Sequence, residues 1–594
     1  MQSFLQKIKA PLLKLRNHKI MGKINVALLM FFPLFVVLVA ELNQMHSIRR
    51  LLSFVWQRPE VIVLDTLMVG IFFAVLLFFF KYAYVAAAIV GLPLYIISCV
   101  EYFKFRSSGS HFVLGDIFMA GNASDLSKFA DIRISFYLVF NLLAVTAYVL
   151  VLLFTGAKIA WRLKNRLIAG TAVTAVTAFV FFSPDISFTI LNSFAVDTEP
   201  SLNVYEANEN FSEDNMLAYL MQDTAVRISN AVKEPADYSE ETVDKVLEQL
   251  PAEREDSISF ESPDIIFVLS ESFGDYRKLL GDTSGLDSYY TNFDAIGKEG
   301  VLGNCVVPTF GGYTTRSEFE LLMGLPVKSL NNSELPHRLL EDRDQASITS
   351  YYNGLGYDTT YIHPFTSSFY DRDGIYAEYG FDRMLFKDDL TVNAEYFRNY
   401  ISDRTVFKQV EQLLSDSDQP HYIFATTMQN HQPYSYPETG LTEFEYYMQG
   451  IGETDKALGD FVEFLKEYDR PVILVFMGDH YPFLNEDGNP YEQAGITAGN
   501  VESLYQKEYL LWSNRELDAS LVPDNISLFY VPYLVRQLTG SPQTEATRLM
   551  EEQMRLCPIY SYNVAESPED NELLDLFTYD AVKGELYFKH SVSD

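Results

Sequence analysis

The sequence predicts a multi-pass α-helical membrane domain joined to an extracellular α/β domain. Two observations predict this division. Five apolar runs lie within the first 200 residues, and short apolar strands alternate with amphipathic helices after residue 260. A chain of 594 residues is also too long for a single hydrophobic core. We therefore expect several domains, with the membrane segments confined to the first third.

Each apolar run has about the 20 residues that an α-helix needs to cross hydrocarbon. Charged residues are almost absent inside the runs, and Asp65 near one end of its run is one exception. A single run could be a buried core helix, and a cleaved signal peptide would explain only one of them. The succession predicts five membrane helices, at residues 24–43, 61–80, 83–100, 135–157 and 167–184.

Charge divides the chain at the same place. Residues 1–200 carry 18 Lys and Arg against 10 Asp and Glu, whereas residues 201–594 carry 27 against 69. Such an acidic outer part repels nucleic acid and argues against nucleic-acid binding. Basic clusters at 7–23 and 158–166 predict cytoplasmic loops, so five crossings of the plasma membrane place the rest of the chain outside. This orientation places one loop with three arginines outside, which does not fit the preference of basic residues for the cytoplasm. These are Arg49, Arg50 and Arg58.

Two connecting segments have a recognisable pattern. Residues 200–258 are acidic and helical in pattern, and Ser212 and Ser239 are each followed by acidic residues that suit a first helical turn. This segment is expected to be a helical linker. Residues 102–133 mix aromatic, basic and small residues, which fits either an amphipathic or lipid-facing element at the outer membrane interface or a plain loop.

After residue 260, the alternation predicts a mostly parallel sheet covered by helices. The strand candidates are 264–270, 358–364, 422–428 and 471–477, and the helix candidates include 403–414 and 453–468. Ligands of such sheets gather beyond the carboxyl ends of the strands. All four strands carry oxygen or imidazole groups at that end, in Ser270-Glu271-Ser272, His363, Asn430-His431 and Asp479-His480.

These strand ends predict a metal site that includes Asp479 and His480. Glu, Asp and His side chains suit Mn²⁺, Mg²⁺ or Zn²⁺. The three cysteines are not placed for a thiolate site. Cys305 and Cys557 could form a disulfide or stay as two buried thiols.

The segment 309–326 offers a nucleophile. Thr315 and Glu318 have the spacing of a capping box, which predicts a helix from about residue 316 with Thr314 just before it. A phosphate would be stabilised at that helix N-terminus, and Gly311 and Gly312 would let the backbone approach it. A metal beside the Thr314 hydroxyl would lower its pKa and activate it. The alternative is that both threonines only cap the helix.

The motifs LSESF, GGYTTRSEF, SSFYDRDGIY, MQNHQPY and FMGDHY occur in this order. Together they resemble the lipoteichoic acid synthase family, membrane-anchored phosphoglycerol transferases related to sulfatases and alkaline phosphatases. The resemblance implies a sulfatase-like outer domain. It also implies domain boundaries at 1–195 for the membrane domain, 196–258 for the linker, 259–545 for the catalytic domain and 546–594 for a C-terminal helix and hairpin.

The same resemblance implies roles for individual residues. Glu271, Asp479 and His480 match metal ligands, with Mn²⁺ expected and Mg²⁺ or Zn²⁺ as alternatives. Thr314 matches a metal-bound catalytic nucleophile. The substrate-binding positions are His431, Arg372, His363 and Tyr370, and Tyr370 stands where the type member has tryptophan.

The implied reaction moves glycerol phosphate from phosphatidylglycerol to a lipoteichoic acid-type chain of polyglycerolphosphate, or to another glycan or glycolipid, through a phosphothreonine. A phosphoethanolamine transferase or a headgroup hydrolase of the same superfamily is the alternative, and a non-catalytic receptor is a more distant one. Sulfatases need a Cys or Ser in a Cys/Ser-x-Pro-x-Arg pattern, which Thr314-Thr315-Arg316 lacks.

Overall fold

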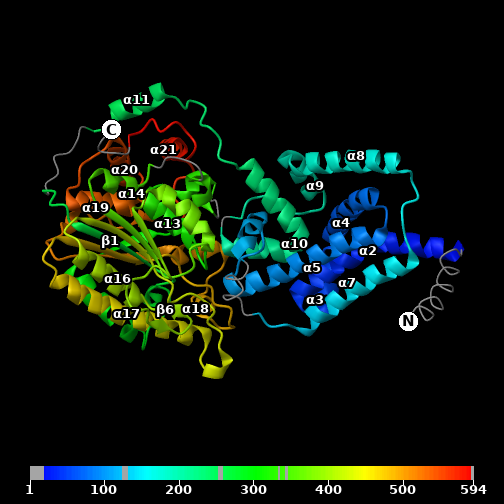
Figure 1. The fold of residues 1–594 in the computed structure, drawn as a ribbon, viewed down its shortest axis with the longest axis horizontal. Coiled ribbons are helices and arrows are strands. Elements are labelled where there is room, and N and C mark those ends of the chain that lie inside the picture. Colours follow the sequence, from blue (N-terminus) through cyan, green and yellow to red (C-terminus); the bar gives the residue numbers. More distant parts are fainter. Residues whose placement is uncertain are drawn as a thin grey trace.

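A computed structural model describes residues 19–122, 132–201, 203–251, 259–331, 335–340 and 346–589. Figure 1 shows a bundle of helices from the first part of the chain beside a domain built around one sheet. The basic residues before Lys19 lie outside the described residues, and so does part of the segment 102–133. The predicted combination of apolar helices with an α/β domain is confirmed.

Four helices in the described part of the chain are long and apolar enough to cross a membrane, or five if a bent pair counts as one span. The four are α2 (Lys19–Met45), α4 (Pro59–Phe80), α5 (Ala83–Ser108) and α7 (Phe136–Thr155). They correspond to the first four apolar runs. Between α2 and α4 lies the short amphipathic helix α3 (Ile48–Gln57).

The fifth predicted helix is bent rather than continuous. Helix α8 (Leu163–Phe181) and helix α9 (Pro184–Ser193) meet at 88°. Pro184 is the first residue of α9 and restricts the residue before it to extended backbone, which ends α8. The apolar run 167–184 therefore spans a break between two helices.

The predicted linker contains two helices, α10 (Val204–Ser229) and α11 (Glu240–Gln249). Ser239 caps α11 as predicted, accepting a hydrogen bond from the Thr242 amide. The cap predicted at Ser212 was wrong, because Asn203 caps α10 and Ser212 lies inside it. Arg58 Nη2 lies 3.2 Å from Oδ1 of Asp214 in α10, so this arginine links the residue before α4 to the linker.

An eight-stranded sheet forms the centre of the outer domain, in the order β10-β2-β9-β8-β1-β7-β3-β4. All strands run in one direction except β9. The four predicted strands are β1 (Asp264–Ser270), β3 (Asp358–His363), β7 (His421–Thr426) and β8 (Val472–Gly478). The others are β2 (Val301–Val306), β4 (Arg383–Phe386), β9 (Gln506–Ser513) and β10 (Ile526–Ser527), and a separate pair joins β5 (Tyr396–Phe397) to β6 (Tyr400–Ile401).

Helices cover both faces of the sheet (Figure 1). Side chains alternate along β1, so Phe267 packs into one hydrophobic core and Val268 into the other. The first core includes α13 (Thr314–Met323), α14 (Ile348–Gly354), α19 (Val531–Thr539) and α20 (Glu545–Leu556), and the second includes α12 (Thr291–Glu299), α16 (Asp403–Asp416) and α17 (Glu443–Lys466). Two single-turn helices, α15 (Arg372–Ile375) and α18 (Pro490–Gln493), lie in the connections.

The C-terminal residues differ from the expected hairpin. Residues 572–582 form helix α21 (Glu572–Val582), and no strand follows it within the described residues to 589. Phe577 of α21 and Phe588 pack in the same core as β1. This C-terminal part is therefore built into the outer domain rather than appended to it.

Candidate functional site

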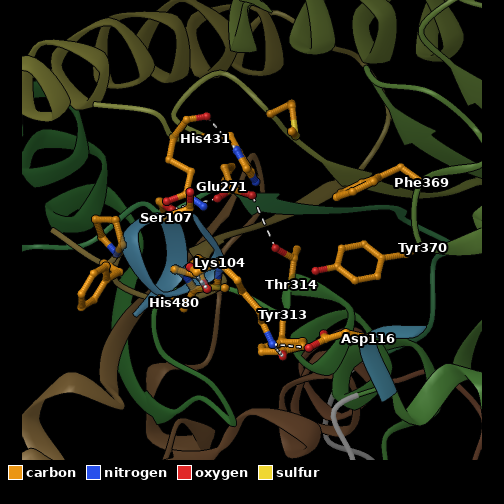
Figure 2. A pocket seen from close by; sticks show the side chains of 18 of the residues that line it. Lys104, Ser107, Asp116, Glu271, Tyr313, Thr314, Phe369, Tyr370, His431 and His480 are labelled. Carbon is orange, nitrogen blue, oxygen red and sulfur yellow. Dashed lines mark hydrogen bonds and ion pairs between the residues drawn. The ribbon is translucent and has the colours of Figure 1, made fainter. Parts of the chain in front are cut away.

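The two central strands β1 and β8 end side by side, with Ser270 opposite Gly478. The next residues in each strand connection are Glu271 and Asp479, so two carboxylates emerge from one edge of the sheet. Figure 2 shows Glu271, His480, Thr314 and His431 around one pocket at this edge. The predicted convergence of strand ends is therefore present in the fold.

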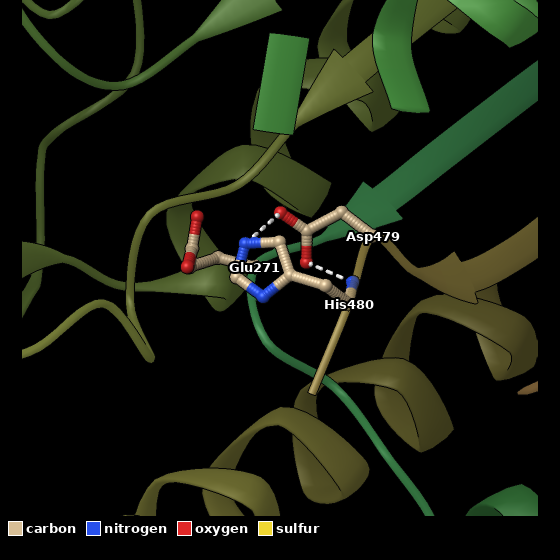
Figure 3. Close-up of side chains that lie close together, drawn as sticks. All are labelled: Glu271, Asp479 and His480. Carbon is tan, nitrogen blue, oxygen red and sulfur yellow. Dashed lines mark hydrogen bonds and ion pairs between the residues drawn. The ribbon is translucent and has the colours of Figure 1, made fainter. Parts of the chain in front are cut away.

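Glu271, Asp479 and His480 are buried and form the one group of potential metal ligands found among the described residues. One ligand atom from each lies within 4.8 Å of the others, and Figure 3 shows the three side chains facing one another. Burial first, and then the Asp479 carboxylate, raise the pKa of Glu271 well above its ordinary value. A divalent cation bound here would offset both effects, so the donor set fits a metal ion.

The orientation of His480 supports the same conclusion. Its Nδ1 lies 3.0 Å from the carbonyl oxygen of Tyr481, so Nδ1 carries the proton and donates it to that oxygen. Nε2 lies 3.1 Å from Asp479 Oδ2 but makes no well-formed hydrogen bond within the described structure. A neutral imidazole fixed through Nδ1 and presenting a lone pair on Nε2 is the usual form of a metal-ligating histidine.

Thr314 belongs to the same cluster. Its Oγ1 donates a hydrogen bond to Asp479 Oδ2 at 2.7 Å and lies 3.4 Å from Glu271 Oε2. Thr314 is also the first residue of α13. The hydroxyl therefore lies beside the potential metal ligands and at a helix N-terminus, where backbone N–H groups and the helix dipole favour a phosphate.

The capping box predicted for Thr315 and Glu318 was wrong. Helix α13 begins at Thr314, and its cap residue is Tyr313 in the left-handed region. Thr315 Oγ1 is buried and has no hydrogen-bond partner in the described part of the chain. Glu318 points away from the helix start, because tertiary partners bind its carboxylate.

The main partner of Glu318 is Arg372. Arg372 Nη2 donates to Glu318 Oε2 at 2.8 Å, and both side chains are almost completely buried. Burial alone would raise the pKa of Glu318, but the Arg372 guanidinium, with hydroxyl donors such as Tyr376, holds this pKa at about 2. Arg372 also lines the pocket. The predicted substrate arginine therefore reaches the pocket already paired with a carboxylate.

The other predicted substrate residues, His363, His431 and Tyr370, line the same pocket. His363 Nδ1 lies 3.0 Å from the Thr426 carbonyl oxygen, and its buried Nε2 has no partner among the described residues. Burial, and then the Arg372 charge, lower the pKa of His363 to about 3. A neutral His363 thus presents a hydrogen-bond acceptor, which suits a hydroxyl group better than a phosphate oxygen.

Backbone strain is concentrated around these residues. Ser272, Tyr313, Tyr370 and Asp371 all have positive φ values, between 54° and 60°. Ser272 follows Glu271, Tyr313 precedes Thr314, and Tyr370 and Asp371 are the two residues before Arg372. Non-glycine residues adopt this conformation at a cost of order 1–3 kcal/mol, and such strain is often found at functional sites. The fold holds these three side chains in place despite that cost.

The pocket is a cavity of about 480 Å³, and the outer-domain residues named above form only part of its wall. The end of the membrane helix α5 contributes Val100, Phe103, Lys104, Ser107 and Ser108. Phe112, Asp116 and Ile117 of the following segment, which includes the 3-10 helix η1 (Leu114–Asn122), complete this side. The described part of residues 102–133 thus forms part of the pocket wall.

All three cysteines are free thiols, and Cys305 in β2 is buried. The possible pairing of Cys305 with Cys557 is therefore not made. The outer domain is held together by its two cores rather than by a disulfide.

Comparisons with known proteins agree with this description. Residues 263–541 match the sulfatase family. A capsular polysaccharide biosynthesis protein, RkpI, of Rhizobium meliloti is 30% identical over 240 residues, covering 39% of this chain and 43% of that protein. The lipoteichoic acid synthase of Staphylococcus saprophyticus is 25% identical over 452 residues, covering 70% of this chain and 66% of that one.

Among solved structures, the phosphoglycerol transferase GacH of Streptococcus pyogenes, in complex with sn-glycerol-1-phosphate, is 25% identical. It matches with a TM-score of 0.49 and covers 60% of this chain and 97% of that chain. The chain spans about half the length of the curated relatives it matches.

Proposed function

We propose that this chain, whose residues 263–541 match the sulfatase family, is a metal-dependent phosphoglycerol transferase that uses a membrane lipid as its donor. One observation carries the proposal. The Thr314 hydroxyl lies 2.7 Å from Asp479 within the potential metal cluster, and it faces a cavity that a membrane helix helps to form. A nucleophile in that position can reach a phosphodiester at the membrane surface.

Glu271, Asp479, His480 and Thr314 Oγ1 would hold the metal. When bound, a divalent cation would lower the pKa of the nearby hydroxyl and offset the charge of the phosphoryl oxygens. We propose Mn²⁺, with Mg²⁺ or Zn²⁺ as alternatives, because carboxylates with one imidazole form a site of intermediate hardness.

The reaction has two displacements at phosphorus. Thr314 Oγ1 forms a bond to the phosphorus of the donor, and the bond from phosphorus to the diacylglycerol oxygen breaks. The threonine loses one proton and the leaving alcohol gains one, so charge and atoms balance. A hydroxyl of the acceptor then attacks the glycerophospho-threonine and restores the Thr314 hydroxyl.

The surrounding side chains bind and orient the donor. The N-terminus of α13 and Arg372 would stabilise the phosphoryl oxygens, although Glu318 already offsets part of the Arg372 charge. His363 Nε2 would accept a hydrogen bond from a hydroxyl of the glycerol headgroup. His431 and Tyr370 would complete the wall on the other side of the phosphate.

We propose phosphatidylglycerol as the donor and a glycan or glycolipid, including a growing polyglycerolphosphate chain, as the acceptor. Both kinds of acceptor are proposed because the relatives include proteins of both lipoteichoic acid and capsular polysaccharide synthesis. A phosphoethanolamine transferase or a headgroup hydrolase remains the alternative. Sulfate-ester hydrolysis is disfavoured because a threonine stands where sulfatases need a modified cysteine or serine.

The proposed orientation has a cytoplasmic N-terminus and an extracellular catalytic domain, divided near residues 195 and 258 as the sequence predicts. Lys158 and Arg162 precede α8, Lys164 and Arg166 lie in its first turn, and this basic cluster supports the orientation. A reporter that is active only outside the cell, fused after residue 589, should be active, and cytoplasmic behaviour would contradict the orientation.

The direct test of the proposed function compares three reactions of the purified full-length protein in vesicles. The first two supply an acceptor with either phosphatidylglycerol labelled in the headgroup glycerol or phosphatidylethanolamine labelled in the ethanolamine, and the third supplies the labelled phosphatidylglycerol without an acceptor. We expect label to move from glycerol to a glycolipid acceptor. Transfer of ethanolamine, or release of glycerol phosphate to water alone, would contradict the proposal and favour one of the alternatives.

A further inference from the structure

We propose that the cavity is a composite donor site, in which helix α5 and residues 109–117 bind the diacylglycerol part of the lipid while the outer domain binds its headgroup. This inference rests on the proposed function and extends it, because it assigns part of the substrate site to the membrane domain. It also identifies the path by which a bilayer lipid would reach Thr314.

One face of α5 leads from the membrane into the cavity. Ile96 and Val100 are exposed on this helix, with 57% and 44% of their surfaces accessible. Phe103 and Ser107 follow at the helical spacings of three and four residues and line the cavity, as Val100 itself does. An acyl chain lying along Ile96 and Val100 would therefore have its glycerol end beside Phe103 and Ser107.

The cavity wall combines apolar and polar side chains. Phe103, Phe112, Ile117 and Phe369 line it together with the polar site residues. A membrane lipid combines the same two kinds of group, because its glycerol backbone carries both acyl chains and a phosphate. A glycan acceptor would need polar partners along the whole wall, so the lipid donor is the occupant that fits.

The contact between α5 and the outer domain is close enough to be specific. Gly109 ends α5 with φ +68°, and a Cβ there would lie 2.4 Å from the Phe483 ring. Gly311 has φ +75°, and its Cβ would lie 3.0 Å from the Ser108 carbonyl oxygen. A side chain at either position would push the helix end away from the site. Both glycines therefore permit the close approach that completes the cavity.

A polar link joins the same helix to the nucleophile. Lys104 Nζ donates to Asp116 Oδ2 at 2.7 Å and to the Tyr313 hydroxyl at 2.9 Å. Tyr313 directly precedes Thr314 and caps α13 in the left-handed region. Figure 2 shows Lys104, Tyr313 and Asp116 together at one side of the pocket. Lys104 is thus a positioning residue that couples the membrane helix to the backbone before Thr314.

Photocrosslinking tests lipid occupancy without relying on activity. The full-length protein in vesicles is exposed to phosphatidylglycerol with a diazirine near the acyl carbonyl, and the crosslinked residues are identified by mass spectrometry. We expect adducts enriched between residues 96 and 117. Adducts spread evenly over the exposed surfaces of α4 and α7, with no enrichment on α5, would overturn the inference.

A filling substitution tests the same site through turnover. Ser107→Trp would fill the part of the cavity beside α5, and Ile71→Trp places the same side chain on the exposed surface of α4 as a matched control. Two donors are compared, bilayer phosphatidylglycerol and the soluble 4-nitrophenyl diester of glycerol phosphate. We expect Ser107→Trp to lose at least about tenfold on the bilayer donor relative to the control, and to lose several-fold less on the soluble one.

Equal effects of Ser107→Trp on both donors, or no effect on either, would contradict the composite site. A wild-type protein that turns over the soluble diester but never phosphatidylglycerol would instead contradict the proposed function. The crosslinking result is read separately in that case, because it reports whether the lipid binds at α5 and not whether it reacts.

Discussion

The carboxylate of Glu318 lies 2.8 Å from the guanidinium of Arg372, deep inside the outer domain and beside the candidate site. Glu318 also accepts a hydrogen bond from the Tyr361 hydroxyl at 2.7 Å. The pair thus connects α13, which begins at Thr314, to the strained turn that precedes Arg372. The pair neutralises two buried charges, and its Arg372 also lines the pocket. Substitutions can separate the effect on stability from the effect on substrate binding.

Arg372→Met should destabilise the protein and stop transfer. The substitution leaves the buried Glu318 carboxylate unpaired, which we expect to cost about 3–5 kcal/mol in the free energy of unfolding. The double substitution Glu318→Gln/Arg372→Met removes that charge and should recover most of the stability but none of the transfer. Denaturant unfolding and the transfer assay measure the two effects. Recovery of transfer in the double variant would show that Arg372 does not bind substrate.

Thr315→Val should leave both stability and transfer close to those of the wild type. The Thr315 hydroxyl makes no hydrogen bond within the described structure, and valine has nearly the same shape. We expect a change in unfolding free energy within about 0.5 kcal/mol, less than the loss of a helix cap. A loss of about 1 kcal/mol or more would indicate that the Thr315 hydroxyl does cap the helix, as the sequence pattern predicts.

His480→Ala should prevent metal binding while leaving the fold intact. The substitution removes the imidazole that faces Glu271 and Asp479 with an Nε2 lone pair. Elemental analysis of the full-length protein after equilibration with Mn²⁺ measures the effect. His363→Ala is the matched control, because it removes a buried histidine of the same pocket that is not among the ligands. Undiminished Mn²⁺ in His480→Ala would refute the ligand assignment.

Glu320 should make stability fall with rising pH. Burial raises the pKa of Glu320 to about 8, from the ordinary value of 4.5. The folded protein therefore keeps a proton that the unfolded chain releases, so this stabilisation is complete below pH 4.5 and is lost as pH rises through about 8. The slope is at most about 1.4 kcal/mol per pH unit.

Glu320→Gln keeps a hydrogen-bond acceptor for the Val327 amide and removes the titration. Between pH 4.5 and 8, the unfolding free energy of the wild type should fall relative to that of the variant as pH rises. A pH-independent difference for Glu320→Gln would mean that Glu320 is ionised in the folded protein.

Part of this structure could be predicted because local patterns determine it. The strands that carry Glu271 and Asp479 are short apolar runs, and their ends are marked by polar residues, so each boundary was predicted within about one residue. Parallel strands then bring those ends to one edge. The residue roles assigned there stay predictions, but their proximity follows from the order of strands.

Other features depend on contacts that no local pattern contains. Thr-x-x-Glu has the same spacing whether Glu318 caps the helix or binds Arg372, and only the position of Arg372, 54 residues away, decides between them. Lys104 and Tyr313 are separated by 209 residues, so the membrane-domain wall of the pocket could not be foreseen. Strand β2 is not predicted because Gly303 and Asn304 interrupt its apolar residues, and the edge strand β10 is not predicted because it has only two residues.

Thr314 should carry the phosphoryl group during transfer, and mass spectrometry can detect this covalent intermediate. The full-length protein is mixed briefly with phosphatidylglycerol and quenched before an acceptor is added. We predict a glycerophosphate adduct on the peptide that contains Thr314, absent in Thr314→Val and retained in Thr315→Val. An adduct that persists in Thr314→Val, or rapid transfer without any adduct in the wild type, would contradict a covalent intermediate on Thr314.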